Sequence, residues 1–179
     1  MKIYMSNLEQ TKNIANMERD LSALDRRRLT EFSNETRKLQ FFASRYLIKQ
    51  ATGKNVIVDK NGVPTIESGF VSISHKDNFV FVAISNSCVG IDIENTSINR
   101  DFAGQSELLG LPKTNDKKTF YKNFVRYEAE FKFGNNAKQV HKYFYEMGEY
   151  LICVCTNEPV EDIQFDSSCM ADIRFLCAE

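Results

Sequence analysis

The order of apolar and polar residues predicts a long helical region near the start of the chain. Between residues 17 and 49, apolar side chains recur every three or four positions, which is the spacing of one helix face. Ser33 is the expected N-cap of the longer helix in this region, and Gly53 is its expected end. We expect an apolar face of Leu39, Phe42, Tyr46 and Leu47, beside a basic flank of Arg37, Arg45 and Lys49.

Alternation of apolar and polar residues predicts three short strands in the middle of the chain. They are expected at residues 70–74, 78–85 and 88–94, separated by the turn-rich segments HKDN and NSC. Strands that follow one another so closely favour an antiparallel meander. Residues 95–116 contain two glycines and a proline, so we expect a loop there with at most a short helix.

A second long helix is expected from about residue 116 to residue 133. The segments VHKYFYEM, EYLICVCT and IQF follow it and resemble the strands of a closing sheet. In this helix we expect a core face of Phe120, Phe124, Tyr127 and Phe131, and an opposite face of Tyr121, Val125, Glu128 and Lys132. The chain is therefore expected to be α+β, with one long helix before strands in each half.

Charge is distributed unevenly along the 179 residues. The formal net charge is −1, but the first 60 residues hold 12 Lys+Arg and 7 Asp+Glu, whereas the remainder holds 11 and 17. A basic segment joined to an acidic one suggests an anionic ligand at one end and a metal ion at the other. From composition alone, a solvated surface with uneven charges is the simpler interpretation.

Cysteine usage and hydropathy favour a reduced, cytoplasmic protein. The five cysteines are odd in number, none lies in a C-x-x-C pair, and no apolar secretory segment follows Met1. The sequence contains no run of about eighteen apolar residues that would predict a membrane span. Cys153 and Cys155 share one face of the run YLICVC, but with only two histidines in the chain a metal site there is a minor alternative.

The stretch CVGIDIEN places two carboxylates on one side of a predicted strand. Side chains two positions apart share a face, so Asp92 and Glu94 point the same way. Oxygen ligands of this kind bind Mg²⁺ together with phosphate oxygens and water, and Glu128 is the candidate third ligand. The simpler interpretations are a solvated acidic pair and, for Glu128, an exposed pair with Lys132 worth about 0.3–0.5 kcal/mol.

Basic side chains upstream of these carboxylates suit a phosphate group. His75 closes the predicted strand VSIS and lies next to Ser74 and Lys76. A histidine in such a turn either holds a phosphate or has no role. Arginine makes bidentate contacts with phosphate oxygens, so the basic flank of the first long helix supplies further candidates.

Three motifs in this order resemble those of the 4′-phosphopantetheinyl transferase superfamily, of its longer monomeric type. The pattern N-[ILV]-S-H-S corresponds to SISHK at residues 72–76, and G-[IV]-D-[IVL]-E is complete as GIDIE at residues 90–94. The pattern W-[ST]-x-K-E-[AS]-x-x-K aligns with FVRYEAEFK at residues 124–132. Residues 37–49 resemble the basic helix of the family, and GVP at residues 62–64 stands where G-K-P is usual. The resemblance covers about residues 25–165.

The resemblance implies a reaction and a role for each candidate residue. A serine hydroxyl of an apo acyl or peptidyl carrier protein would attack the β-phosphate of coenzyme A and release 3′,5′-ADP. Mg²⁺ would be bound by Asp92, Glu94 and Glu128, with Glu128 also acting as the base and Lys132 contacting the pyrophosphate. Coenzyme A would be held by Arg37, Arg45, Lys49, Gly62, Pro64, Ser74 and His75.

The resemblance also implies two similar lobes, each an antiparallel sheet packed on a long helix, with the active site in the cleft between them. The N-terminal lobe would span residues 1–88 and the C-terminal lobe residues 89–179. The protein would be a monomer without nucleic-acid or membrane partners. Tyr127 and Val63 each replace a lysine of the family pattern. They keep open a second interpretation, a catalytically degenerate protein that binds coenzyme A or a carrier protein.

Overall fold

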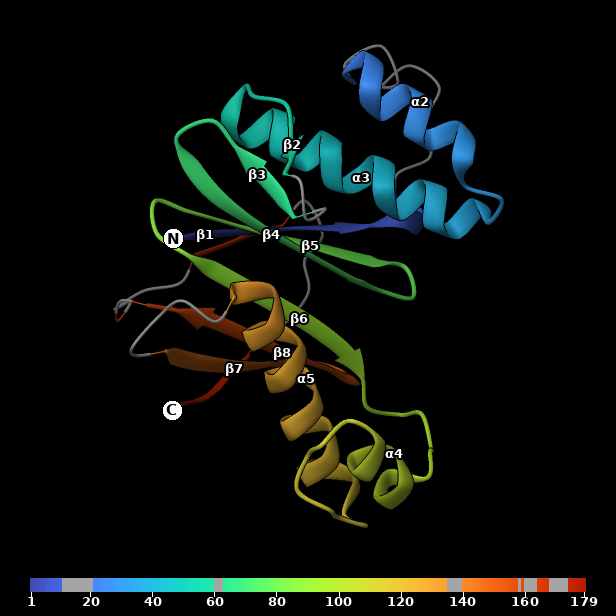
Figure 1. The fold of residues 1–179 in the computed structure, drawn as a ribbon, viewed down its shortest axis with the longest axis vertical. Helices are drawn as coiled ribbons and strands as arrows, with labels where there is room; N and C mark the ends of the chain where they lie inside the picture. Colours follow the sequence, from blue (N-terminus) through green and yellow to red (C-terminus); the bar gives the residue numbers. More distant parts are fainter. Residues whose placement is uncertain (11–20, 60–62, 135–139, 158, 160–163, 168–173) are drawn as a thin grey trace.

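Two sheets and four α-helices make up the described part of an α+β fold (Figure 1). The computed structural model describes residues 1–10, 21–59, 63–134, 140–157, 159, 164–167 and 174–179. Sheet A consists of β1 (Lys2–Asn7), β2 (Ile57–Val58), β3 (Pro64–Ile66), β4 (Gly69–Lys76), β5 (Phe79–Ser85) and β9 (Gln164–Ser167). Sheet B consists of β6 (Val89–Asn95), β7 (His141–Met147), β8 (Tyr150–Thr156) and β10 (Arg174–Ala178).

The helices are the 3-10 turn η1 (Leu8–Gln10), α2 (Ala23–Glu31), α3 (Glu35–Thr52), α4 (Phe102–Leu108) and α5 (Lys117–Phe133). Helix α4 is the short helix expected between residues 95 and 116. The N-cap of α3 is Asn34, one residue after the expected Ser33, and its side chain accepts a hydrogen bond from the backbone N–H of Arg37. Gly53 ends α3 as expected, with φ at 71°. Among the described helices, none is long and apolar enough to cross a membrane.

The strand order joins distant parts of the chain. Sheet A has the order β2-β3-β4-β5-β1-β9, and sheet B has the order β10-β7-β8-β6. Neighbouring strands are antiparallel except β1 and β9, which are parallel. The chain therefore passes from sheet A to sheet B at β6, returns to sheet A with β9 and re-enters sheet B with β10.

The expected meander of three strands is wrong in its third member. Strands β4 and β5 pair as predicted, but β6 pairs with β8 in sheet B. The place beside β5 is taken by β1, a strand that the sequence analysis did not assign. Likewise, the segment IQF does not close sheet B, because β9 pairs with β1 and the edge beside β7 belongs to β10.

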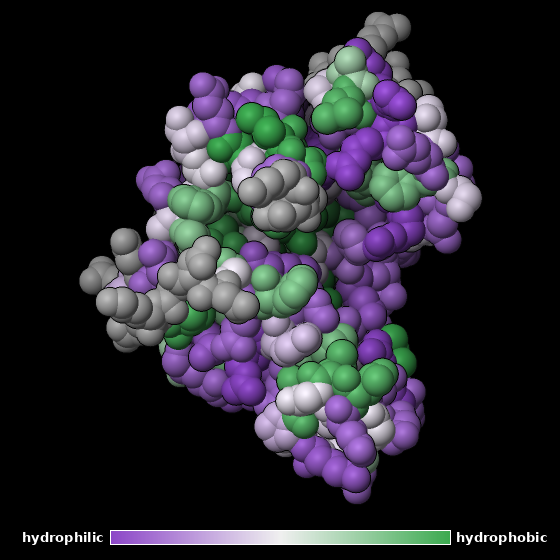
Figure 2. Space-filling model, viewed as in Figure 1, coloured by the Kyte–Doolittle hydropathy of each residue, from purple (hydrophilic) through white to green (hydrophobic). Residues whose placement is uncertain are grey.

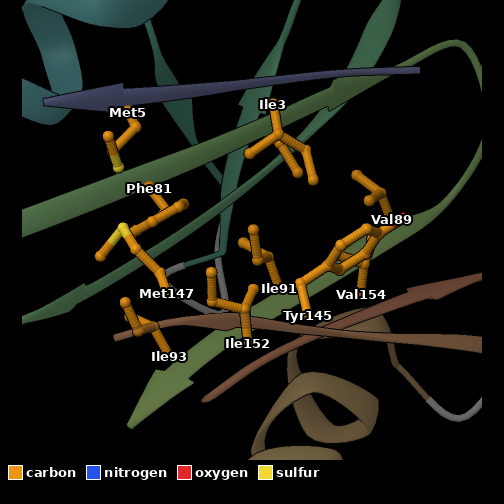
Figure 3. Close-up of a cluster of buried hydrophobic side chains, with 11 residues drawn as sticks. Ile3, Met5, Phe81, Val89, Ile91, Ile93, Tyr145, Met147, Ile152 and Val154 are labelled. Carbon is orange, nitrogen blue, oxygen red and sulfur yellow. The ribbon is translucent and has the colours of Figure 1, made fainter. Parts of the chain in front are cut away.

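A shared apolar core lies between the facing sides of the two sheets (Figure 3). Alternation in β1 and β5 directs Ile3, Met5 and Phe81 into this core, and alternation in β6 directs Ile91 and Ile93 into it from the other side. All five side chains are fully buried, and burial of each contributes about 1.5–3 kcal/mol. This core holds the sheets together and leaves the other face of each sheet to a helix.

Each long helix covers the outer face of one sheet. Helix α3 packs on sheet A through a cluster that includes Ala43, Ile48 and Val82. Helix α5 packs on sheet B through a cluster that includes Cys153 and Cys155, which are the buried thiols expected from the sequence. On the face of the molecule drawn in Figure 2, apolar side chains gather over the edge strand β2 and its neighbour β3, and around α4.

Helix α5 uses a different core face from the one that its aromatic residues predict. Val125 and Ala129 are fully buried, whereas Tyr127 is 37% exposed and Phe131 is 74% exposed. The expected face is therefore wrong at Tyr127 and Phe131, whereas Phe120 is fully buried and Phe124 is partly buried against the same cluster. Helix α5 approaches β6 closely near its end, so Tyr127 and Phe131 lie on its outer side, while Phe120, Tyr121 and Phe133 are buried.

Gly90 is the residue that allows this close approach. A Cβ atom at position 90 would collide with the carbonyl oxygen of Ala129 and would lie 2.7 Å from the backbone nitrogen of Phe133. No side chain fits between strand and helix at this point. The last two turns of α5 therefore lie directly on the face of β6 that carries Asp92 and Glu94.

We expect the substitution Gly90→Ala to lower the free energy of unfolding by about 3 kcal/mol or more, because both backbones must move apart. Urea denaturation measures this loss. The control is Gly53→Ala, where no atom lies within 4 Å of the added Cβ. There the only cost is that of placing alanine in a left-handed backbone conformation, roughly 1–2 kcal/mol. A Gly90→Ala variant as stable as the control would contradict the close packing of α5 on β6.

Candidate functional site

The two sheets meet along a seam between β4 and β6, and serine hydroxyls of β4 bridge it. The hydroxyl of Ser72 accepts a hydrogen bond from the backbone N–H of Ile91 at 3.0 Å, and the hydroxyl of Ser74 accepts one from Ile93 at 3.3 Å. Both serines are buried. The hydroxyls supply the acceptors that backbone carbonyls supply inside a sheet. This seam sets Ser74 beside Asp92.

Asp92 is a buried carboxylate at the seam and faces α5. Its Oδ1 accepts hydrogen bonds from the Ser74 hydroxyl at 2.8 Å and from the Lys132 ammonium at 2.6 Å. The same ammonium donates to Ser74 Oγ and to the carbonyl oxygen of Ile91. The other oxygen, Asp92 Oδ2, is buried and has no hydrogen-bond partner among the described residues. Because an unpaired buried acceptor is costly, Oδ2 is a position that a bound cation would satisfy.

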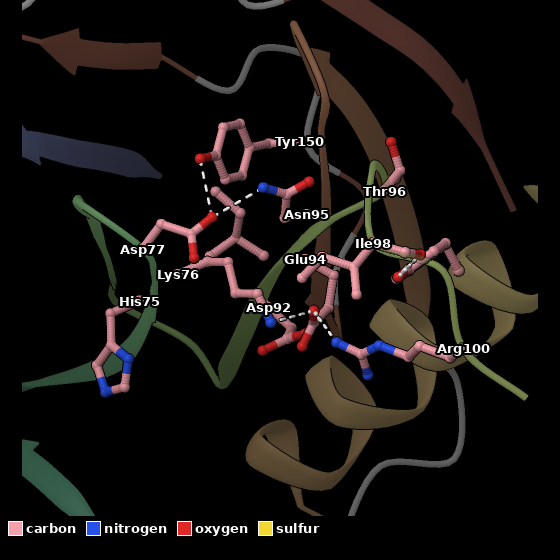
Figure 4. Close-up of polar contacts among 12 residues, drawn as sticks. His75, Lys76, Asp77, Asp92, Glu94, Asn95, Thr96, Ile98, Arg100 and Tyr150 are labelled. Carbon is pink, nitrogen blue, oxygen red and sulfur yellow. Dashed lines mark hydrogen bonds and ion pairs between the residues drawn. The ribbon is translucent and has the colours of Figure 1, made fainter. Parts of the chain in front are cut away.

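Glu94, two positions further along β6, is held by two cations (Figure 4). The ammonium of Lys76 lies 2.7 Å from Glu94 Oε2, and a guanidinium nitrogen of Arg100 lies 3.5 Å from the same oxygen. The Arg100 guanidinium also lies 5.6 Å from the ring centroid of Tyr121 and 5.8 Å from that of Phe124. The sequence analysis missed Arg100, since a single arginine in an irregular loop belongs to no periodic pattern.

Glu128 projects from α5 into the same electrostatic environment. Its partial burial raises the pKa of the carboxyl group, and repulsion from Asp92 and Glu94 raises it further, while the charge of Lys132 opposes the rise. The structure thus brings together the three predicted metal ligands and Lys132. As they stand, no three Asp, Glu, His or Cys side chains of the described segments form a ready-made metal-binding group. Ammonium and guanidinium groups hold Asp92 and Glu94 instead.

His75 and Arg37 form a second part of the site, on the sheet A side of the seam. Arg37 Nη1 lies 2.9 Å from His75 Nε2, so the start of α3 reaches the end of β4. Burial, and after it the charge of Arg37, lowers the pKa of His75 to about 4, and Lys132 and Lys76 act in the same direction. His75 is therefore neutral at pH 7 and surrounded by cations, an environment that suits an anion.

Asp77 fixes the turn that follows His75 and Lys76 onto sheet B (Figure 4). Its Oδ2 accepts hydrogen bonds from the side-chain amide of Asn95 at 2.8 Å and from the hydroxyl of Tyr150 at 3.0 Å. Burial and this bond to Asp77 raise the pKa of Tyr150 to about 12. The turn of sheet A is therefore tied to two strands of sheet B, which limits movement across the seam.

Arg45 does not join the site, and its expected place on a solvent-facing flank is wrong. The side chain is only 8% exposed, its Nε donates to Asp25 Oδ1 at 3.2 Å, and its guanidinium lies 4.3 Å from the ring centroid of Phe41. Asp25 belongs to α2, so a helix packed on α3 supplies the partner that allows burial of the arginine. The predicted contact of Arg45 with coenzyme A has no support in these interactions.

The other predicted coenzyme ligands are spread along sheet A and α3. Lys49 follows Arg37 by twelve positions in α3, roughly 18 Å along the helix axis. Pro64 begins β3, near the edge of sheet A. Gly62 lies outside the described residues. Of the residues expected to bind coenzyme A, those that the described contacts bring to the seam are therefore Arg37, Ser74 and His75.

Removal of the positive charge in Arg37→Ala is expected to raise the pKa of His75 from about 4 toward its ordinary value of 6.5. Between these values the unfolded chain binds a proton that the folded chain does not, so stability falls as the pH falls through this range. NMR titration of the imidazole measures the pKa, in a His141→Gln background that leaves one histidine. Lys38→Met removes an exposed cation from the same helix and should leave the pKa unchanged. A pKa near 6.5 before and after Arg37→Ala would contradict this environment.

No protein-family model and no curated protein matches this sequence. The resemblance to phosphopantetheinyl transferases therefore rests on the three short motifs. The structure adds two observations to these motifs. Contacts at the seam join Asp92 to Lys132 and Ser74. Glu128 interacts electrostatically with Asp92 and Glu94.

Proposed function

We propose that this protein is a 4′-phosphopantetheinyl transferase, which moves phosphopantetheine from coenzyme A to a serine of an apo acyl or peptidyl carrier protein. One observation carries the proposal: Asp92 is paired with Lys132 at the seam, and the charges of Asp92, Lys132 and Glu94 act on Glu128. Beside them lies the cationic environment of His75 and Arg37. An acidic cluster next to a basic one suits a magnesium ion and the phosphates that it binds.

The chemistry of the carboxylates supports Mg²⁺ as the cofactor. All three offer hard oxygen ligands, and Asp92 Oδ2 is a buried acceptor that none of the described donors satisfies. A divalent cation would also offset the repulsion that raises the pKa of Glu128. We therefore assign the ion to Asp92, Glu94 and Glu128. When bound, it would stabilise negative charge on the phosphate oxygens of coenzyme A.

Glu128 and Lys132 are the residues proposed to act in the transfer itself. A serine hydroxyl is a weak nucleophile near neutral pH and needs a base. Partial burial, the largest cause of its raised pKa, makes Glu128 a stronger base than an ordinary carboxylate. As the serine oxygen bonds to the β-phosphorus, Glu128 takes the hydroxyl proton, and 3′,5′-ADP leaves with the electrons of the broken P–O bond. The Lys132 ammonium, partly exposed beside Asp92, would contact the pyrophosphate.

Arg37 and His75 are proposed to hold a phosphate of coenzyme A, with Ser74 beside them. The Arg37 guanidinium reaches His75 from α3, and arginine suits bidentate contact with phosphate oxygens. A phosphate near His75 would favour the protonated imidazole, since it offsets the surrounding positive charge. Lys49, Pro64 and Gly62 stay predictions from the motif resemblance.

The proposal includes two similar lobes with the active site in the cleft between them. The two halves are built alike, which supports this part of the proposal. Helix α3 lies on the outer face of sheet A and α5 on the outer face of sheet B, and the sheets share a core. The candidate residues come from both halves, β4 and α3 on one side and β6 and α5 on the other. A cytoplasmic monomer is part of the same proposal.

A second candidate function is a coenzyme-binding or carrier-binding protein without transferase activity. Its support is that two cations hold Glu94 and that Tyr127, exposed to solvent, stands where the family pattern has lysine. Such a protein would keep the phosphate contacts of Arg37 and His75. It would lack an effective metal site.

Incubation of an apo acyl carrier protein with this protein, coenzyme A and Mg²⁺ is expected to add one phosphopantetheinyl group, seen by intact-mass spectrometry. EDTA should prevent the addition. Asp92→Asn and Glu128→Gln should each lower the rate by about 100-fold or more, because they remove a metal ligand or the base. Lys113→Met, in an exposed ion pair with Glu107, should transfer normally. Full transfer by Asp92→Asn, or transfer in EDTA, would overturn the metal assignment.

Coenzyme A alone is expected to raise the melting temperature of the protein. A ligand at about 100 times its dissociation constant stabilises the folded state by about 2.7 kcal/mol, which is several degrees in a domain of this size. Arg37→Ala should reduce the rise, whereas Lys38→Met should not. A clear rise without transfer to any of several carrier proteins would favour the binding protein, and no rise at all would contradict both functions.

A further inference from the structure

Both cations that hold Glu94 contact the same carboxylate oxygen, Oε2. Lys76 is the closer, at 2.7 Å, and comes from the end of β4 across the seam. Arg100 is at 3.5 Å and is retained beside the rings of Tyr121 and Phe124. Lys76 therefore makes the stronger contact with Glu94. Among the described ion pairs and hydrogen bonds, the Lys76 ammonium has no second partner.

Asp92 is paired in a different way, and the difference matters for a metal ion. Lys132 and Ser74 both contact Oδ1, while Oδ2 stays without a partner among the described residues. An ion can approach Asp92 without displacing Lys132. At Glu94, an ion competes directly with an ammonium group that is already in place.

The formal charges at this point are balanced without an ion. The carboxylates of Asp92, Glu94 and Glu128 carry three negative charges, and Lys76, Arg100 and Lys132 carry three positive charges. A divalent cation would leave an excess of positive charge, which disfavours binding of the ion by itself. An anion that enters with the ion would remove this excess.

We propose that Lys76 is a specificity-determining residue that competes with a divalent cation for Glu94, so that this protein binds the ion weakly unless an anionic ligand is present. The inference rests on the proposed function, because it takes Asp92 and Glu94 as metal ligands. When the ion displaces Lys76, its ammonium is free to pair with a phosphate near His75, the residue before it in β4. Ion and anion then favour each other's binding, and this coupling is reciprocal.

The test measures binding of Mn²⁺ alone, by electron paramagnetic resonance of the free ion, without coenzyme A. Lys76→Met keeps most of the side-chain volume and removes the charge, and it is expected to tighten Mn²⁺ binding by about 10–100-fold. Lys76→Arg keeps the charge and should bind Mn²⁺ as weakly as the wild type. Lys142→Met is the matched control, because it breaks a lysine–glutamate pair on sheet B and α5, with Glu130, and should leave Mn²⁺ affinity unchanged.

The outcomes separate this inference from the proposed function. Unchanged or weaker Mn²⁺ affinity in a folded Lys76→Met variant, with Asp92→Asn abolishing binding, would overturn the role of Lys76 and leave the metal site standing. No Mn²⁺ binding by either the wild type or Lys76→Met would overturn both. If Lys76→Met fails to fold, Lys76→Gln replaces it, with the same expected result.

Discussion

Hydrogen bonds across the seam between β4 and β6 position every other part of the candidate site. The two strands belong to different sheets, and their alignment depends on serine hydroxyls at alternate positions of β4 that accept from backbone amides of β6. A shift of one residue would turn both hydroxyls to the opposite face of the strand. The hydroxyl of Ser74 also donates to Asp92, so the contact that aligns the strands is the contact that orients the first carboxylate.

Two neighbouring carboxylates on one strand are tolerated here because each has a cation of its own. Ion pairs of this kind contribute little net stability, since the desolvation of both partners offsets their attraction. Three acids and three bases lie at the junction of the sheets, and the close packing of α5 on Gly90 brings two of these six groups there, Glu128 and Lys132.

Local patterns predicted most elements, and tertiary contacts decided what the patterns left open. The bounds of α3, α5, β4 and β5 follow from caps, turns and alternation. Alternation predicts which side chains of a strand share a face, but it does not predict which strand is its neighbour in the sheet. The pairing of β6 with β8 was therefore missed. The face of α5 was missed because packing on Gly90 outweighed aromatic character. At the site, the period of two identified Asp92 and Glu94, whereas the burial of Arg45 and the approach of Arg100 depend on partners distant in sequence.

The parallel pairing of β1 with β9 has a consequence for the order in which the protein assembles. Strand β1 precedes β9 in the chain by more than 150 residues, so one of its two edges stays open until residues 164–167 are available. Until then, sheet A presents unpaired backbone groups that can pair with another chain. During synthesis this edge of sheet A is therefore exposed to association until β9 has emerged, and a chaperone that shields the edge would act before that point.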